Sequence, residues 1–485
     1  MSSDPISDIA ESLGIPYLYP IQRFVISNTL EGKNQIVILP TAAGKSLCFQ
    51  VASQKLPGLT IVVVPLLSLL SDQLKKCAQS GLPAGMIKGG QPEAERNKLF
   101  REIREGKLRL IFTTPEAIYQ PRIKAAFGEL EISHFVVDEA HCVWEWGREF
   151  RPAYLHIGEV IKAFKAGTVT AFTATAGRQV LGKIQEFLFS GLEVNTVIGN
   201  PDRPNIKYRV LPVLSKSRAL EHIVRASERP VVVFTRSRKG AELSAGTLIR
   251  RFTGQEIFFY HAGLFHEERA RLESWFQDSE TGILTATCAY GMGVDKPNIR
   301  TVIHCDLPFS VEAYLQESGR AGRDGKPTRA FLLYSDEDIR YAGRIRDPFE
   351  RQRYKQMLDF AGGKGCRREA LLALLGFNDI YCSGCDVCEG SAVFSPEAKE
   401  EIFKFVSNHK RAYTLRELQQ ILAGRITYDV RRQNLDRIPG FGLLKDWNEE
   451  DVAEALSNMI ESSILKIQNK GFWKHSVRPA VQEVQ

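Results

Sequence analysis

ISHFVVDEAHCVWEWGREFRP, residues 132–152, carries the strongest structural signal in this chain. Its first six residues are apolar enough for a buried strand, and Asp138 and Glu139 stand where that strand should end. In nucleotide hydrolases an aspartate at the end of a core strand holds Mg²⁺, and a neighbouring acid orients or deprotonates the attacking water. The sequence therefore predicts a hydrolytic centre with Asp138 on the metal ion and Glu139 on the water.

Aromatic and basic residues directly follow the two acids. Trp144, Trp146 and Phe150 alternate with Arg148 and Arg151. Such a mixture stacks bases and holds the phosphates of single-stranded nucleic acid. Two tryptophans beside a strand end can equally be core residues, but their place next to the acids favours DNA binding.

The run DEAHCVWEWGREFRP resembles the ATPase box and aromatic-rich loop of RecQ-family DNA helicases in order and spacing. In that family the loop couples single-strand binding to ATP hydrolysis. The resemblance covers about residues 10–395 strongly and the remainder weakly. It implies a superfamily 2 enzyme that uses ATP, Mg²⁺ and Zn²⁺, binds single-stranded and duplex DNA, moves 3′ to 5′, and unwinds duplexes in DNA repair or recombination.

A phosphate-binding loop is expected upstream of the acids. An apolar strand at 35–39 leads into Thr41-Ala42-Ala43-Gly44-Lys45-Ser46 and a helix-compatible segment. A strand, a turn and a helix N-terminus form a cradle of backbone N–H groups, with Lys45 on the β- and γ-phosphates and Ser46 on Mg²⁺. The strict pattern has glycine where Leu39 stands, and the RecQ version has glycines at 42 and 43. Superfamily 2 helicases share this shorter phosphate-loop pattern, which lacks the first glycine.

An adenine-reading glutamine is also implied by the resemblance. Gln22 falls where helicases of this superfamily place a glutamine that reads the adenine edge. The family pattern Phe-Arg-Pro-x-Gln is replaced here by Leu18-Tyr19-Pro20-Ile21-Gln22. Tyr19 therefore stands in place of an arginine that would stack on the base.

Strand and helix segments alternate along the first two thirds of the chain. Apolar strands are expected at 60–65, 108–115, 168–176, 231–234, 257–261 and 283–287, and helices at 237–252 and 267–276. A Pro-rich break at 200–205 separates two such series. This rhythm predicts two parallel α/β sheets. The second has no phosphate loop, as in a second motor lobe that closes on nucleotide held by the first.

The second lobe contributes the run Gln316-Glu317-Ser318-Gly319-Arg320-Ala321-Gly322-Arg323. A helix is expected here, with Arg320 and Arg323 on one face. A guanidinium matches a phosphate bidentately, so both are arginine-finger candidates that act when the lobes close. The preceding YGMGVDKP, residues 290–297, resembles the family's motif before the fingers, and Gln316 is assigned to nucleotide binding.

Four of the nine cysteines cluster, namely Cys366, Cys382, Cys385 and Cys388. Two CxxC steps share Cys385, which leaves four thiolates for one tetrahedral ion. Chance clustering and a disulfide framework are the alternatives, and disulfides suit a cytosolic chain poorly. RecQ proteins carry a structural zinc at this place, so the resemblance implies Zn²⁺.

The C-terminal part predicts a winged helix, a fold that commonly binds duplex DNA. Amphipathic helices are expected at 396–409, 415–423 and 449–462, followed by a strand at 464–467. Arg431, Arg432 and Arg437 either contact phosphates or are solvated loop residues. The expected domains are a first motor lobe, a second motor lobe, a zinc-binding domain and a winged-helix domain, at 1–204, 205–335, 336–392 and 393–485.

Charge and hydropathy fit this interpretation. The formal net charge is +7, and residues 361–485 hold equal numbers of acidic and basic side chains, so the excess lies in residues 1–360. No run of about 18 apolar residues exists and the N-terminus is not a signal peptide. A cytoplasmic protein is expected, nucleoid-associated in a bacterium or nuclear in a eukaryote, without a membrane partner. An RNA helicase or an ATP-gated nucleic-acid clamp is the alternative function.

Overall fold

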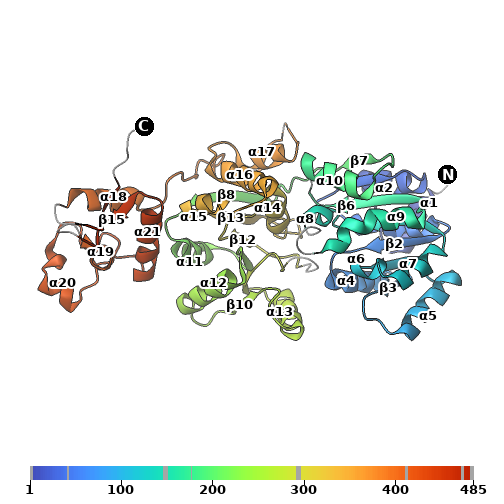
Figure 1. Ribbon diagram of the computed structural model, residues 1–485, viewed down its shortest axis with the longest axis horizontal. Helices are drawn as coiled ribbons and strands as arrows, with labels where there is room; N and C mark the ends of the chain where they lie inside the picture. The colour runs from blue at the N-terminus through green and yellow to red at the C-terminus, as the bar shows by residue number, and fades with distance from the viewer. Residues whose placement is uncertain are drawn as a thin grey trace. The chain divides into compact units, whose positions relative to one another are not determined.

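The structure of the protein is a computed structural model, and it describes residues 4–40, 43–145, 151–175, 177–290, 296–378, 380–409, 413–470 and 474–480. The chain divides into two compact units, the first formed mainly by residues up to Arg203 and the second by most residues from Pro204 onward. The labels follow Figure 1.

The first unit is built on a seven-stranded sheet with the order β3-β4-β2-β5-β6-β1-β7, in which all neighbouring strands are parallel. Its strands are β1 Gln35–Ile38, β2 Leu59–Val63, β3 Ala84–Ile87, β4 Leu110–Thr113, β5 Ile132–Val137, β6 Thr168–Thr173 and β7 Asn195–Ile198. The residues of β1, β2, β4 and β6 are all buried. Near-continuous apolar strands of this kind are typical of parallel sheets covered on both faces.

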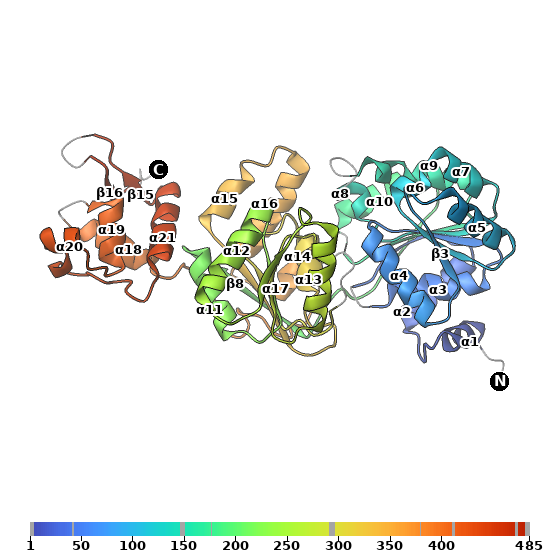
Figure 2. The ribbon, with the colours of Figure 1, turned by 90° about the horizontal axis from the view of Figure 1, so that it is seen from below.

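Helices cover both faces of this sheet (Figure 2), and a separate hydrophobic core lies between the sheet and the helices on each face. One face carries α1 Pro5–Ser12, α2 Pro20–Leu30, α3 Lys45–Lys55 and α4 Leu67–Gln79. The other carries α5 Glu93–Arg104, α6 Pro115–Ile118, α7 Pro121–Gly128, α9 Ile157–Phe164 and α10 Arg178–Leu188. The short α8, Cys142–Glu145, follows β5. The carboxyl ends of the strands are thereby left to carry functional loops.

The second unit contains a six-stranded parallel sheet with the order β10-β11-β9-β12-β13-β8. Its strands are β8 Ile206–Pro212, β9 Val231–Phe234, β10 Ile257–Tyr260, β11 Ile283–Ala286, β12 Thr301–His304 and β13 Thr328–Tyr334. Its helices are α11 Lys216–Ala226, α12 Arg238–Arg251, α13 His266–Asp278 and α14 Val311–Ser318. Buried residues of α11 and α12 form one core with the sheet, so these two helices cover the same face (Figure 2).

After the second sheet the chain becomes helical. Helices α15 Asp336–Ala342, α16 Pro348–Gly362 and α17 Arg367–Leu374 lead to the cysteine-rich segment. The C-terminal domain contains α18 Lys399–Asn408, α19 Leu415–Leu422, α20 Tyr428–Arg432 and α21 Glu449–Glu461, with β14 Tyr413–Thr414, β15 Leu465–Ile467 and β16 Ser476–Pro479. The strands form a small antiparallel sheet against the helices around one core. This is the winged-helix arrangement expected from the sequence.

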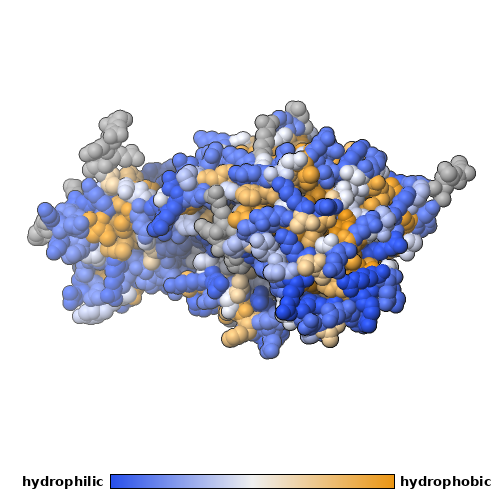
Figure 3. Space-filling model, turned by 45° about the vertical axis from the view of Figure 1, so that its right-hand side comes forward, coloured by the Kyte–Doolittle hydropathy of each residue, from blue (hydrophilic) through white to orange (hydrophobic). Residues whose placement is uncertain are grey.

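The face of the molecule in Figure 3 is largely hydrophilic, with hydrophobic residues in scattered groups. Among the residues that the structure describes, no helix combines the length and the apolar character needed to cross a membrane.

Candidate active site

The phosphate-binding loop lies between β1 and α3, as the sequence predicts. Thr41 and Ala42 lie outside the described residues, whereas Ala43, Gly44 and Lys45 lead directly into the helix. Gly44 has a left-handed conformation (φ +72°), and a Cβ there would lie 2.4 Å from Nε2 of Gln22. Only glycine fits this turn, and the turn sets Lys45 and Ser46 at the N-terminus of α3, where backbone N–H groups favour phosphate.

Asp138 and Glu139 lie at the carboxyl end of β5, beside the phosphate loop. Lys45 Nζ is 3.5 Å from Glu139 Oε1, although the two residues are far apart in sequence. Burial, together with the nearby Glu139 carboxylate, raises the pKa of Asp138 to about 6. Lys45 opposes that shift, and a bound divalent cation would oppose it further. This part of the sheet therefore gathers groups for binding a metal–nucleotide complex.

Glu139 has an unusual backbone conformation, with φ +48°. A non-glycine residue in the left-handed region costs on the order of 1–3 kcal/mol, and such residues cluster at functional sites. Its side chain lies 3.5 Å from Nδ1 of His141, and that nitrogen is 3.1 Å from the hydroxyl of Thr173 at the end of β6. Glu139 is thus connected through His141 to the end of β6.

Gln22 lies against the phosphate loop and is only 2% exposed. Its Nε2 donates to the carbonyl of Ala43 at 2.9 Å, and its Oε1 accepts from the backbone N–H of Tyr19 at 2.8 Å. The ring of Tyr19 is exposed and meets Tyr17 edge to face, with ring centroids 5.6 Å apart. An exposed aromatic ring therefore stands where the family pattern has arginine.

The sequence interpretation missed Gln73. Gln73 lies on α4, and its Nε2 donates to Ser46 Oγ at 3.0 Å. The hydroxyl of Ser46 and the carboxylate of Asp138 are hard oxygen donors of the kind that Mg²⁺ prefers. These residues fit a magnesium–nucleotide complex, and Gln73 adds a buried amide beside the serine.

Trp144 does not have the position expected of a base-stacking residue. It is 7% exposed, its ring packs near Phe187 of α10 at a centroid distance of 6.2 Å, and Lys183 Nζ lies 5.1 Å from the ring centre. The assignment of Trp144 to DNA binding is therefore corrected to core packing, because helix α10 covers the ring. Trp146, Arg148 and Phe150 lie outside the described residues.

Arg151 is held within the first lobe. Its Nη1 donates to the carbonyl of Pro65, after β2, and its Nε is 3.6 Å from Glu116 of α6. These contacts join Arg151 to the residues after β2 and to helix α6. The assignment of Arg151 to DNA binding stays a prediction.

Arg320 and Arg323 do not lie on a helix, contrary to the expectation from sequence. Helix α14 contains Gln316 but ends at Ser318, and the chain then forms turns. The helix has its C-cap at Gly319, and within the turns that follow Gly322 has φ +53°, where a Cβ would lie 2.5 Å from Nδ2 of Asn205. Both arginine side chains are half-buried and close enough to Tyr290 to lower the pKa of its hydroxyl, which burial raises.

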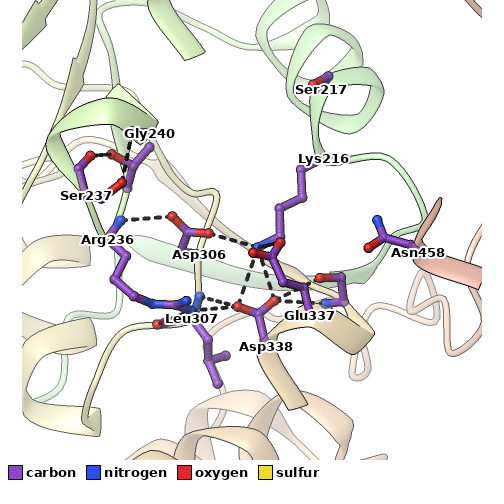
Figure 4. Close-up of polar contacts among 12 residues, drawn as sticks. Lys216, Ser217, Arg236, Ser237, Gly240, Asp306, Leu307, Glu337, Asp338 and Asn458 are labelled. Carbon is purple, nitrogen blue, oxygen red and sulfur yellow. Dashed lines mark hydrogen bonds and ion pairs between the residues drawn. The ribbon is translucent and has the colours of Figure 1, made fainter. Parts of the chain in front are cut away.

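A buried ion network lies at the carboxyl edge of the second sheet (Figure 4). Lys216 Nζ is 2.9 Å from Asp306 and 3.3 Å from Asp338, and Arg236 Nη2 is 2.9 Å from Asp338. Burial alone would raise the pKa of Asp306, but the charge of Lys216 holds it below its usual value. The network joins the loops after β9 and β12 to α15, and it stiffens the edge from which α12 begins.

The four clustered cysteines come together as predicted. The sulfur atoms of Cys366, Cys382, Cys385 and Cys388 all lie within 4.8 Å of one another, a set that could hold one metal ion. The same segment pairs with the edge of the second sheet. Cys385 forms an isolated parallel bridge with Tyr208 of β8, and the Asp386 carboxylate accepts from the N–H of Val210 at 2.9 Å and from Arg367 Nε at 3.0 Å.

Comparison with known families agrees with this arrangement. The DEAD/DEAH box helicase family model matches residues 19–184, the helicase conserved C-terminal domain matches 215–325, and the RQC domain matches 396–484. These spans cover the first sheet with its phosphate loop, the second sheet, and the C-terminal winged helix.

Similar proteins are helicases. The ATP-dependent DNA helicase RecQ of Pasteurella multocida is 30% identical over 461 residues, covering 92% of this chain and 72% of that protein. The probable ATP-dependent DNA helicase RecS of Bacillus subtilis is 36% identical over 322 residues, covering 66% and 64%. The structure of Mycobacterium smegmatis helicase Lhr bound to ssDNA and AMP-PNP has a TM-score of 0.55 at 18% identity, covering 95% and 74%, which shows a shared fold. Because identity at this level extends over nearly the whole chain and most of the Pasteurella protein, the chain belongs to the RecQ family of ATP-dependent DNA helicases.

Proposed function

We propose that the protein is a DNA helicase that couples ATP hydrolysis to 3′ to 5′ movement along single-stranded DNA and to duplex unwinding. The observation that carries the proposal is the 3.5 Å approach of Lys45 to Glu139, with Asp138 beside them at the carboxyl edge of the first sheet. Mg²⁺ would offset the charge on the phosphates when bound. The cellular setting that suits this activity is the nucleoid or the nucleus.

Each residue has a distinct role in this proposal. Lys45 binds the β- and γ-phosphates from the N-terminus of α3, and Ser46 and Asp138 hold the metal ion. Glu139 orients the attacking water and takes its proton. Its approach to His141, and the contact of that histidine with Thr173, supply a route by which the state of the site reaches the end of β6.

We propose that the domains have the boundaries expected from the sequence, with motor lobes at 1–204 and 205–335. Residues 336–392 hold a structural zinc through the four cysteines, and residues 393–485 bind duplex DNA. The compactness of the sulfur cluster supports the zinc assignment.

Replacing Arg323 with alanine is expected to leave nucleotide binding near normal and to lower the ATP turnover rate by about 1,000-fold or more, since an arginine finger acts on the transition state. Binding of a fluorescent ATP analogue and steady-state hydrolysis measure the two effects separately. Arg329→Ala is the control, because Arg329 is an exposed arginine of β13 in the same lobe. A variant whose main defect is weaker nucleotide binding, with turnover unchanged, would show that Arg323 is not a finger.

Replacing Trp146 with alanine should abolish stimulation of ATP hydrolysis by single-stranded DNA more than it lowers the basal rate. A stacked base is worth about 1–3 kcal/mol, so strand binding should weaken but persist on phosphate contacts. Trp144→Ala is the matched control. Because Trp144 is buried against α10, its loss should lower the melting temperature and reduce basal and stimulated rates together. A well-folded Trp146→Ala protein with the wild-type stimulation ratio would exclude the coupling role.

Strand displacement on tailed duplexes tests the function as a whole. We expect unwinding of DNA with a 3′ overhang, and little or none with a 5′ overhang or with RNA. Unwinding of RNA would favour the RNA helicase alternative. ATP hydrolysis and DNA binding without strand displacement would favour an ATP-gated clamp.

A further inference from the structure

Helices α3 and α4 meet along a buried polar seam that begins at the active site. Ser46 and Gln50 lie one turn apart on α3, and Gln73 and Cys77 lie one turn apart on α4. Nε2 of Gln73 donates to Ser46 Oγ at 3.0 Å, and Nε2 of Gln50 lies 3.6 Å from the sulfur of Cys77. The two contacts lie one turn apart along both helices. The contact between Gln50 and Cys77 therefore helps to hold α4 at the axial position that brings Gln73 to Ser46.

The carboxamide of Gln73 is only partly used within the protein. The residue is 8% exposed, and its Oε1 is buried without a hydrogen-bond partner among the residues that the structure describes. An unsatisfied buried acceptor costs about 1–3 kcal/mol and calls for an explanation. An apolar residue of similar size would fill the space without that cost, so packing alone does not account for glutamine here.

We propose that Gln73 is a positioning residue for the metal–nucleotide complex: its amide fixes the hydroxyl of Ser46 for the magnesium ion, and its Oε1 accepts a hydrogen bond from a water of the ion's shell. This inference rests on the proposed ATPase function. Mg²⁺ keeps several waters when it binds a nucleotide, so a nearby acceptor has a donor available. By accepting from Gln73 with one lone pair, the serine oxygen keeps the other for the ion.

Residues that orient a metal ligand are worth about 10–100-fold in metal affinity. Nucleotide affinity without the ion should not depend on Gln73, because the amide touches the serine and not the phosphate cradle. The distinguishing quantity is therefore the ratio between the dissociation constants measured in EDTA and in Mg²⁺.

The experiment measures binding of a fluorescent, non-hydrolysable ATP analogue to the full chain, with Mg²⁺ and with EDTA. Gln73→Met keeps length and burial but removes the amide, and Gln73→Asn keeps an amide that is one methylene too short. Both should lower the ratio of the dissociation constant in EDTA to that in Mg²⁺ by about 10-fold or more. The affinity in EDTA should stay unchanged. Gln50→Met is the matched control on the same seam, and it should keep the wild-type ratio.

A wild-type ratio in folded Gln73→Met or Gln73→Asn would overturn the inference. So would an equal loss in Gln50→Met, since the effect would then come from helix packing. Should the wild-type protein itself bind the analogue equally well with and without Mg²⁺, the proposed ATPase site would be wrong. That outcome is distinct from failure of Gln73 alone.

Discussion

Alanine at position 45 is expected to lower ATP turnover by at least about 100-fold while single-stranded DNA binding stays largely intact. The lysine lies at the N-terminus of α3 and within 3.5 Å of Glu139, so its loss removes a phosphate-binding charge and leaves the two acids less well compensated. Strand binding should persist because the proposal assigns it to other residues. Steady-state hydrolysis and fluorescence anisotropy with a labelled oligonucleotide measure the two properties.

Lys55→Ala is the matched control for this experiment. Lys55 is an exposed residue in the last turn of the same helix, so the change removes a lysine from α3 without touching the phosphate loop. Hydrolysis at the wild-type rate in Lys45→Ala would refute the assignment of the loop.

Serine in place of Cys385 is expected to abolish zinc binding, unfold the cysteine-rich segment and lower the yield of folded protein. Structural zinc contributes on the order of 10 kcal/mol in isolated zinc-finger peptides, so the loss of one ligand removes a large part of the segment's stability. Cys385 is fully buried and pairs with β8, so the damage should reach the second sheet. Elemental analysis should find about one zinc per wild-type chain, and a melting curve should show the destabilisation.

Cys288→Ser serves as the control, because it removes an exposed thiol outside the cluster. It should keep both the metal and the melting temperature. Wild-type protein prepared without chelators and found free of metal would contradict the zinc assignment, and so would full zinc content in Cys385→Ser.

The two sheets could be predicted from sequence because parallel strands covered on both faces are continuous apolar runs. Strand β9, Val231–Phe234, has the bounds expected from its four apolar residues. The phosphate loop and the two acids were also visible, since a strand end fixes their place. The sulfur cluster followed from spacing, because three of the four cysteines stand three residues apart and Cys366 lies sixteen residues before the first of them.

Features that depend on tertiary contacts could not be predicted from the sequence. The sequence neighbours of Trp144 are those of a DNA-binding loop. Its ring is nevertheless covered by α10, which lies further along the chain. The arginines at 320 and 323 have helical spacing, yet α14 ends at Ser318 and they lie in turns that contain a left-handed Gly322 close to Asn205. Gln73 showed no signal because its partner is 27 residues away on another helix.

The left-handed backbone of Glu139 has an evolutionary consequence. Glycine adopts this conformation freely and asparagine more readily than most residues, so either would relieve the backbone strain that glutamate carries here. Neither can take a proton from water. A population of variants screened for heat resistance alone should therefore accumulate glycine or asparagine at position 139 and lose ATP hydrolysis. On the proposed role of Glu139, only selection for turnover would keep glutamate at this position.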